Sequence, residues 1–201
     1  ITHEQRYALV VQDPKSADII KPFLRGRDVK RWNVESQDLW LIFTRRGVDI
    51  DGYPAVKAHL QAFRKQLEAK PDVWDDKTQG AWPGRKAGSY EWYHIQDNIA
   101  YWEEFLLPKI IVPAITDNVN YAPDLTGYFS NDKTSIVVSE DWRYLLTILN
   151  SAVSWWLTKQ LFASKQGGFF EFKPMYVSAI PIPQVTNDQR TVLEPLVEAT
   201  I

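Results

Sequence analysis

Residues 142–157 read WRYLLTILNSAVSWWL, and they carry the strongest helical pattern of the chain. Apolar side chains recur there at the spacing of one helix face. Ser139 stands just before two acidic residues, and a hydroxyl followed by acids stabilises the positive end of a helix. Asn150 and Ser151 interrupt the apolar pattern. We therefore expect the main core helix of the protein here, with a break at these two residues.

Shorter apolar segments have the composition of β-strands, because they are rich in β-branched and aromatic residues and are bounded by turn-forming residues. The expected strands lie at residues 38–44, 91–96, 109–112, 119–122 and 135–138. Helices and strands follow one another without a repeated strand–helix–strand unit. This order predicts an α+β fold with a mixed or antiparallel β-sheet region and a packed helical core.

Other helices are expected from their start and stop signals. Thr2 opens a capping-box pattern at the start of a first helix, and prolines flank a second helix over residues 54–67. Asn187 is expected to cap a final helix that Pro195 kinks. Residues 75–90 combine glycines with charged side chains, which is typical of an exposed loop.

The chain has 201 residues, of which 45% are hydrophobic and 24% charged, and it has no cysteine. This composition is typical of one folded domain, residues 1–201, and it excludes a disordered chain, a disulfide scaffold and a thiolate metal site. No apolar run approaches the roughly 18 residues of a membrane helix, so we expect a cytoplasmic protein without a membrane partner. Because the first residue is Ile1 rather than methionine, we expect a piece of a longer protein.

Catalytic motifs are hard to find. The three histidines are far apart, and the chain contains no glycine-rich phosphate-binding signature. Asp124, Glu171 and Lys173 are the residue types with which magnesium-dependent nucleases hold a metal. Their separation is longer than usual for such a site, and a turn aspartate with two surface charges is the simpler interpretation. A nuclease is kept as one hypothesis.

Positive charge is concentrated near the start of the chain. Residues 15–31 contain six bases and two acids, although the net charge of the whole chain is only −2. Pro22 is expected to end a short turn and to be followed by a loop over residues 23–28. A basic segment of this kind is either a surface that faces phosphates or a solvated face on which Asp28 pairs with an arginine.

Two more arginines, Arg45 and Arg46, follow the expected strand 38–44 directly. They would converge with the basic segment if that strand paired with residues 29–32. Lys and Arg neutralise phosphates and can grip guanine edges in the grooves of DNA, and Gly26 would let the backbone approach closely.

Six short motifs occur in a fixed order along the chain. They are IIKPFLRGRDV at 19–29, WYHIQ at 92–96, KIIVP at 109–113, YLLTILNS at 144–151, GG at 167–168 followed by FKP at 172–174, and IPIP at 180–183. Together they resemble the TaqI-like C-terminal specificity domain, the target recognition domain of adenine-specific DNA methyltransferases and of fused type II restriction-modification enzymes. The last motifs are similar also to the specificity subunits of multi-subunit restriction enzymes.

The resemblance implies a domain that grips double-stranded DNA and reads a short sequence. A preceding methyltransferase domain would bind S-adenosylmethionine, flip the target adenine and methylate it. This chain has neither the Asn-Pro-Pro-Tyr motif nor the cofactor loop of such a domain, so we expect no catalytic residue, metal or cofactor in it. The parent would belong to a restriction-modification or phage-defence system, and whether it also cleaves DNA stays open.

By motif position, the resemblance implies a DNA-facing role for a set of basic residues and one glycine. They are Lys21, Arg25, Gly26, Arg27, Lys30, Arg31, Arg45, Arg46 and Lys109. Residues 144–156 and 180–183 are expected to serve as framework. The alternative from a different class is a protein-interaction module that docks a methyltransferase or restriction partner.

Overall fold

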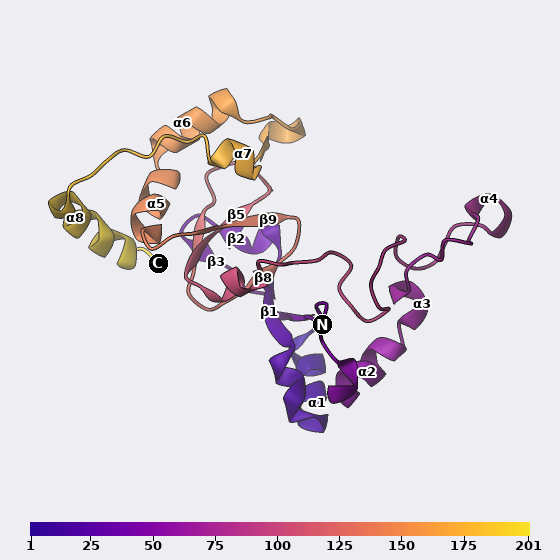
Figure 1. Cartoon of the computed structure of the whole chain (residues 1–201). Coiled ribbons are helices and arrows are strands. Elements are labelled where there is room, and N and C mark those ends of the chain that lie inside the picture. Colours follow the sequence, from indigo (N-terminus) through magenta and orange to yellow (C-terminus); the bar gives the residue numbers. More distant parts are fainter. The chain divides into compact units, whose positions relative to one another are not determined.

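The computed structural model describes every residue, Ile1–Ile201, and the chain forms two compact units. The first unit comprises Ile1–Pro22 and Asp38–Ala100, and the second comprises Phe23–Gln37 and Tyr101–Ile201 (Figure 1). The expected single domain of residues 1–201 stays a prediction, because compactness alone does not say whether either unit folds independently. No helix is long and apolar enough to cross a membrane.

The first unit is mostly helical. Its elements are α1 (His3–Gln12), η1 (Pro14–Asp18), β4 (Leu39–Ile42), η3 (Ile50–Gly52), α2 (Pro54–Gln61), α3 (Arg64–Leu67) and α4 (Asp76–Gln79). Thr2 caps α1 in a capping box with Gln5, as predicted. The core includes Leu9 from α1, Ile20 and Val56, all buried.

Two expectations for this unit need correction. The helix over 54–67 forms as two helices, α2 and α3, with Ala62 and Phe63 between them. The strand over residues 91–96 is wrong, because these residues form turns. The carbonyls of Trp92 and His94, which a strand would offer to a neighbouring strand, instead accept hydrogen bonds from the Arg85 guanidinium.

β1 (Ile20–Leu24) begins in the first unit and ends in the second. The sequence interpretation, a turn ended by Pro22 and followed by a loop, misses this strand. A proline lacks only the amide donor, its fixed φ is compatible with an extended chain, and the pairs that β1 makes with β8 begin only after it, at Phe23. In the second unit, Phe23 and Leu24 pair in parallel with β8 (Phe129–Ser130).

The second unit is built on an antiparallel sheet of strand order β7-β5-β9. Its strands and short 3-10 turns are η2 (Gly26–Asp28), β2 (Val29–Lys30), β3 (Asn33–Val34), η4 (Trp102–Leu106), β5 (Lys109–Pro113), β6 (Ile115–Thr116), β7 (Ala122–Asp124), β9 (Thr134–Val138), η5 (Gln166–Gly168) and β10 (Phe170–Glu171). Every residue of β5 is buried, because it is the central strand. β2 pairs with β3 rather than with the strand over 38–44, so the condition for a convergence of Arg45 and Arg46 with the basic segment is not met.

The helices of the second unit are α5 (Trp142–Leu149), α6 (Ala152–Leu161), α7 (Pro174–Val177) and α8 (Asn187–Glu198). The predicted break of the core helix at Asn150 and Ser151 is confirmed. Asn150 is fully buried and exchanges hydrogen bonds of 2.8 and 3.2 Å with the backbone of Tyr121. The Ser151 hydroxyl caps α6 by accepting a hydrogen bond from the Ser154 amide.

The apolar face of α5 forms the largest core cluster of the chain together with the sheet. Leu146 and Leu149 pack there with Ile110, Val112 and Phe172. The combination of a mixed and antiparallel sheet region with a packed helical core confirms the α+β fold.

Candidate nucleic-acid interface

The predicted basic loop is a tight turn closed by one carboxylate. Asp28 accepts hydrogen bonds of 2.9 Å from the backbone amide of Arg25 and from its Nε and Nη2 atoms. The Asp28 side chain is only 5% exposed, whereas that of Arg25 is 31% exposed. Burial of Asp28 opposes ionisation, but the hydrogen bonds from Arg25 outweigh it, and the pKa of Asp28 lies below its ordinary value. Arg25 therefore holds the turn in shape.

Arg27 is placed differently in the same turn. Its side chain is exposed, and its guanidinium has no hydrogen-bond or ion-pair partner in the structure. Lys30 donates a hydrogen bond of 2.9 Å to the Arg27 carbonyl and lies 3.7 Å from Glu35, so it stabilises the turn. Of the cations in this turn, Arg27 is the one whose side chain has no hydrogen-bond or ion-pair partner.

The missing side chain of Gly26 allows another turn of the protein to pack against it. A Cβ atom at this position would lie 2.6 Å from the carbonyl oxygen of Lys133, which no side chain tolerates. The absence of a side chain is thus explained by packing between two turns. The expectation that Gly26 lets the backbone approach DNA is not needed to account for this glycine.

Arg31 is exposed but tethered. Its Nη2 atom donates a hydrogen bond of 2.6 Å to the carbonyl of Asn150, at the break between α5 and α6. Its guanidinium also lies 5.9 Å from the ring of Trp32. Arg31 links the β2–β3 segment to the core helices through its Nη2 atom, and its guanidinium has further N–H donors.

Lys109 is not a surface residue, and its expected contact with DNA is therefore corrected. The side chain is fully buried, and Nζ lies 2.5 Å from the carboxylate of Asp124. Burial lowers the pKa of Lys109, and the ion pair with Asp124 opposes that effect. We leave Lys109 out of the proposed interface.

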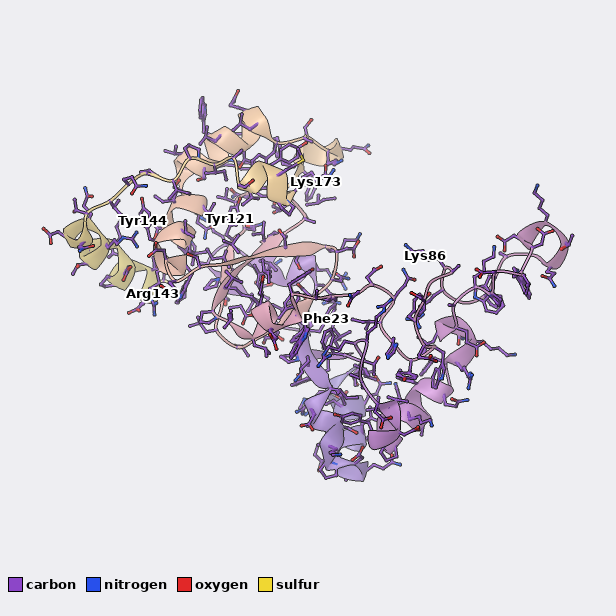
Figure 2. The ribbon with its side chains drawn as sticks, viewed as in Figure 1. Phe23, Lys86, Tyr121, Arg143, Tyr144 and Lys173 are labelled. Atoms are coloured by element: carbon purple, nitrogen blue, oxygen red, sulfur yellow. The ribbon has the colours of Figure 1, made fainter.

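The same pair argues against a nuclease site. Besides Lys109, the Asp124 carboxylate accepts hydrogen bonds from the amides of residues 126, 127 and 128, at 2.8, 3.1 and 2.8 Å. Glu171 lies 3.3 Å from both Lys165 and Lys173 (Figure 2 labels Lys173). Both carboxylates are occupied by protein donors, and no three His, Cys, Asp or Glu residues of the chain are grouped as a metal site.

The remaining predicted residues, Lys21, Arg45 and Arg46, belong to the first unit. Arg46 donates a hydrogen bond of 3.2 Å to the Gln96 carbonyl, and Arg45 donates one of 3.2 Å to the carbonyl of Arg46. All three side chains are half-buried. The convergence expected between Arg45, Arg46 and the basic turn depended on a strand pairing that does not form.

Arg85 is a residue that the sequence analysis missed. Its guanidinium donates hydrogen bonds of 2.6, 2.6 and 2.7 Å to the carbonyls of Leu67, His94 and Trp92. The WYHIQ motif at 92–96 thus supplies two of the three backbone acceptors for a half-buried cation. The motif marks two of the three acceptor residues in the sequence, whereas no sequence pattern marks Arg85, which lies outside the motif.

The predicted framework role holds for α5 and for Ile180, whereas Val153 and Trp156 of α6 and Ile182 of the IPIP segment are exposed. The Tyr144 hydroxyl donates a hydrogen bond of 2.7 Å to the carbonyl of Pro183. Arg143, beside it on α5, donates one of 2.8 Å to Glu198 of α8 (Figure 2). Tyr144 and Ile180 are buried.

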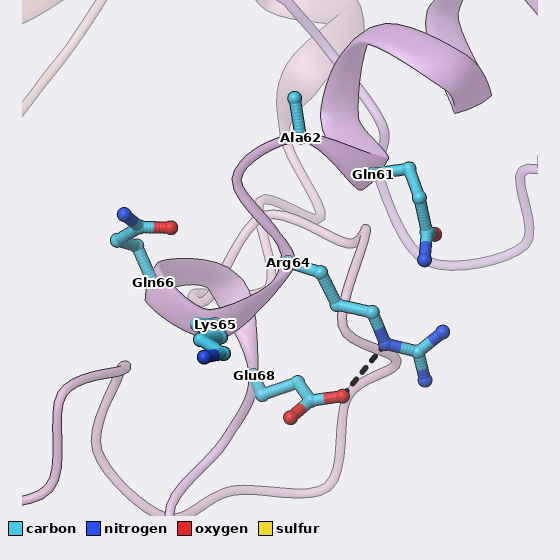
Figure 3. A pocket seen from close by; sticks show the side chains of 6 residues that line it. All are labelled: Gln61, Ala62, Arg64, Lys65, Gln66 and Glu68. Carbon is cyan, nitrogen blue, oxygen red and sulfur yellow. Dashed lines mark hydrogen bonds and ion pairs between the residues drawn. The ribbon is translucent and has the colours of Figure 1, made fainter.

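Two hollows lie on the surface of the protein. One, of about 370 Å³, lies at the α2–α3 break, and its charged pair Arg64–Glu68 is closed by a 2.7 Å hydrogen bond (Figure 3). The other, of about 310 Å³, lies between β9, α5 and α7 and is lined mostly by aliphatic side chains such as Leu149 and Val177. Neither contains a glycine-rich loop that could cradle phosphates.

Two known proteins to which the chain is similar are type II methyltransferases. The chain is 23% identical to the type II methyltransferase M.XhoI of Xanthomonas vasicola and 26% identical to the type II methyltransferase M.PaeR7I of Pseudomonas aeruginosa, each over 186 residues that cover 90% of this chain. It spans 32% and 30% of those two proteins, about a third of their length.

The fold is similar to part of a solved structure, that of the Type IIL restriction-modification enzyme MmeI in complex with DNA. The TM-score is 0.61 at 14% sequence identity, and the match covers 99% of this chain and 25% of that one. At this identity the likeness concerns the fold alone. The model of the TaqI-like C-terminal specificity domain matches residues 21–182, and the chain belongs to that family.

Proposed function

We propose that this chain recognises a short target sequence in double-stranded DNA on behalf of an adenine-specific DNA methyltransferase. The observation that carries the proposal is membership in a specificity-domain family over residues 21–182, a range that includes the basic turn. Within that turn, Arg27 offers an exposed guanidinium on a backbone held by the Arg25–Asp28 fork. The planar guanidinium of Arg27, on a backbone that is held in place, suits a contact with a phosphate or a guanine edge.

The chemical step belongs, in this proposal, to a methyltransferase domain of the same parent chain. That domain would bind S-adenosylmethionine and the flipped adenine, whereas this chain would position the DNA. The methyltransferase relatives, about three times as long as this chain, support such a division of labour. We place the parent in the cytoplasm, within a restriction-modification or phage-defence system.

Two measurements test the proposal. The purified chain is expected to enrich one short motif from a pool of random duplexes, with an affinity that falls as salt rises. Incubated with S-adenosylmethionine and the enriched duplex, the chain alone is expected to transfer no methyl group. Failure to bind any duplex at low salt would refute target recognition, and methyl transfer would refute the absence of catalysis.

A further inference from the structure

The turn that carries Arg27 has a neighbour far away in the sequence. β1 and β8 pair in parallel, with Leu24 opposite Ser130. Because paired parallel strands end at the same edge of a sheet, the segments that follow Leu24 and Ser130 leave it side by side. One segment is the turn η2 with Arg27, and the other is the turn at residues 131–133.

The two turns are in direct contact through Gly26. Its Cβ position lies 2.6 Å from the carbonyl oxygen of Lys133 and 3.4 Å from the Cβ atom of Lys133. That carbonyl cannot retreat, because it accepts a hydrogen bond of 2.8 Å from the Ala114 amide at the end of β5. Gly26 is therefore a positioning residue that seats the second turn against the first.

The second turn presents polar side chains to solvent. Asn131, Asp132 and Lys133 are all exposed, and the Asn131 side-chain oxygen accepts a hydrogen bond of 3.1 Å from the Lys133 amide. The Lys133 ammonium pairs only with Asp132, and the two side chains are 67% and 73% exposed. Exposed ion pairs contribute little stability, so Lys133 can exchange this carboxylate for another anion at small cost.

We propose that Arg27, Asn131 and Lys133 form one DNA-contacting surface, here called the two-turn surface, in which Lys133 neutralises a backbone phosphate of double-stranded DNA. The proposal rests on the proposed function and adds to its site a turn that no sequence motif marks. Arg27 and Lys133 supply the positive charge, while the Asn131 amide supplies donors for a neighbouring phosphate or base edge.

The test is a salt titration of duplex binding, read by fluorescence anisotropy with a short labelled DNA of arbitrary sequence. Lys133→Ala is compared with the unchanged chain, with Arg27→Ala and with Lys57→Ala. Lys57 is the control, because it also pairs with an exposed aspartate, Asp51, in the first unit, although its side chain is 43% exposed and that of Lys133 is 67% exposed. The slope of log K against log salt is negative, and we expect Lys133→Ala to reduce its magnitude by about 0.9, the value for one phosphate contact. Lys57→Ala should leave the slope unchanged.

The outcomes separate the two proposals. If Lys133→Ala binds with the slope of the unchanged chain, the two-turn surface is refuted, whereas DNA recognition stands. If Lys57→Ala reduces the magnitude of the slope as much as Lys133→Ala, the effect is one of overall charge, and the surface is again refuted. If the unchanged chain binds no duplex, the proposed function itself fails. A slope of smaller magnitude for Lys133→Ala and Arg27→Ala, with Lys57→Ala unchanged, supports the surface.

Discussion

Two arginines of one turn, Arg25 and Arg27, have different roles because only one of them has an acceptor within the protein. The guanidinium of Arg25 is held by the nearly buried carboxylate of Asp28, whereas the side chain of Arg27 is exposed and makes no hydrogen bond or ion pair, although its charge also helps to lower the pKa of Asp28. A substitution at each position should therefore affect a different property.

We expect Arg27→Ala to weaken binding to the preferred duplex, by about 1–3 kcal/mol if the side chain contacts a base, and to leave the urea midpoint unchanged. Arg25→Ala should instead lower the midpoint, because it leaves Asp28 without its main donors. Anisotropy titrations and urea unfolding measure the two effects. An Arg25→Ala chain of full stability that no longer binds DNA would contradict this division.

The Arg25–Asp28 pair also predicts a dependence on acid. The folded-state pKa of Asp28 lies below its ordinary value, since the hydrogen bonds from Arg25 outweigh the effect of burial. Such a group stabilises the fold above its ordinary pKa, about 3.9, and this contribution is lost as the pH falls through the lowered value. We expect stability to fall below about pH 4, and less steeply in Asp28→Asn. Equal acid dependence of both proteins in urea unfolding would exclude Asp28 as the cause.

The buried pair Lys109–Asp124 is expected to matter for stability alone. Removing one partner of a buried ion pair leaves a charge without compensation and costs about 3–5 kcal/mol. Lys109→Ala should therefore destabilise the protein by about that amount, while the fraction that remains folded binds DNA as before. Lys173→Ala, at a 54% exposed lysine, serves as control and should change the midpoint little. A stable Lys109→Ala chain with weaker DNA binding would return Lys109 to the interface.

Among the elements, the α5–α6 junction shows how two polar residues end one core helix and start the next. Asn150 satisfies the Tyr121 backbone inside the core, and Ser151 caps α6. We expect Ser151→Ala to cost about 1 kcal/mol, as for a lost N-cap, and Asn150→Ala about 1–3 kcal/mol, because it leaves buried backbone groups unpaired. Urea unfolding measures both, with Ser178→Ala as an exposed hydroxyl control. A cost for Ser151→Ala above that for Asn150→Ala would reverse this order.

The elements that the sequence predicts correctly are those whose signal is local. The break at Asn150 and Ser151 is visible because two polar residues interrupt an apolar face. The strand over 91–96 is wrongly predicted because its carbonyls bind Arg85, a residue outside the segment. Lys109 is misplaced for a similar reason, since its partner Asp124 lies on the neighbouring strand β7 and only the register of the sheet brings the two together.

In the candidate site, too, some contacts could be predicted from the sequence and others could not. The turn with Arg25, Arg27 and Asp28 could be predicted, and pairing of Asp28 with an arginine was one of the two interpretations. The contact of Gly26 with Lys133 could not, because it depends on the parallel pairing of β1 with β8. A sequence motif identifies residues within one segment of the chain. It does not show which distant segments strand pairing brings together into one surface.

The whole molecule consists of two compact units that are interleaved along the chain, since residues 23–37 of the second are inserted between the two parts of the first. β1 carries residues of both, so unfolding either unit disrupts the same strand. We therefore expect one cooperative urea transition, as for a single domain, with the same midpoint by tryptophan fluorescence and by far-UV circular dichroism. Four of the nine tryptophans, Trp40, Trp74, Trp82 and Trp92, lie in the first unit, so fluorescence reports on both. Two separated transitions would show two independent domains, and the basic turn would then have to be tested for DNA binding within the second unit alone.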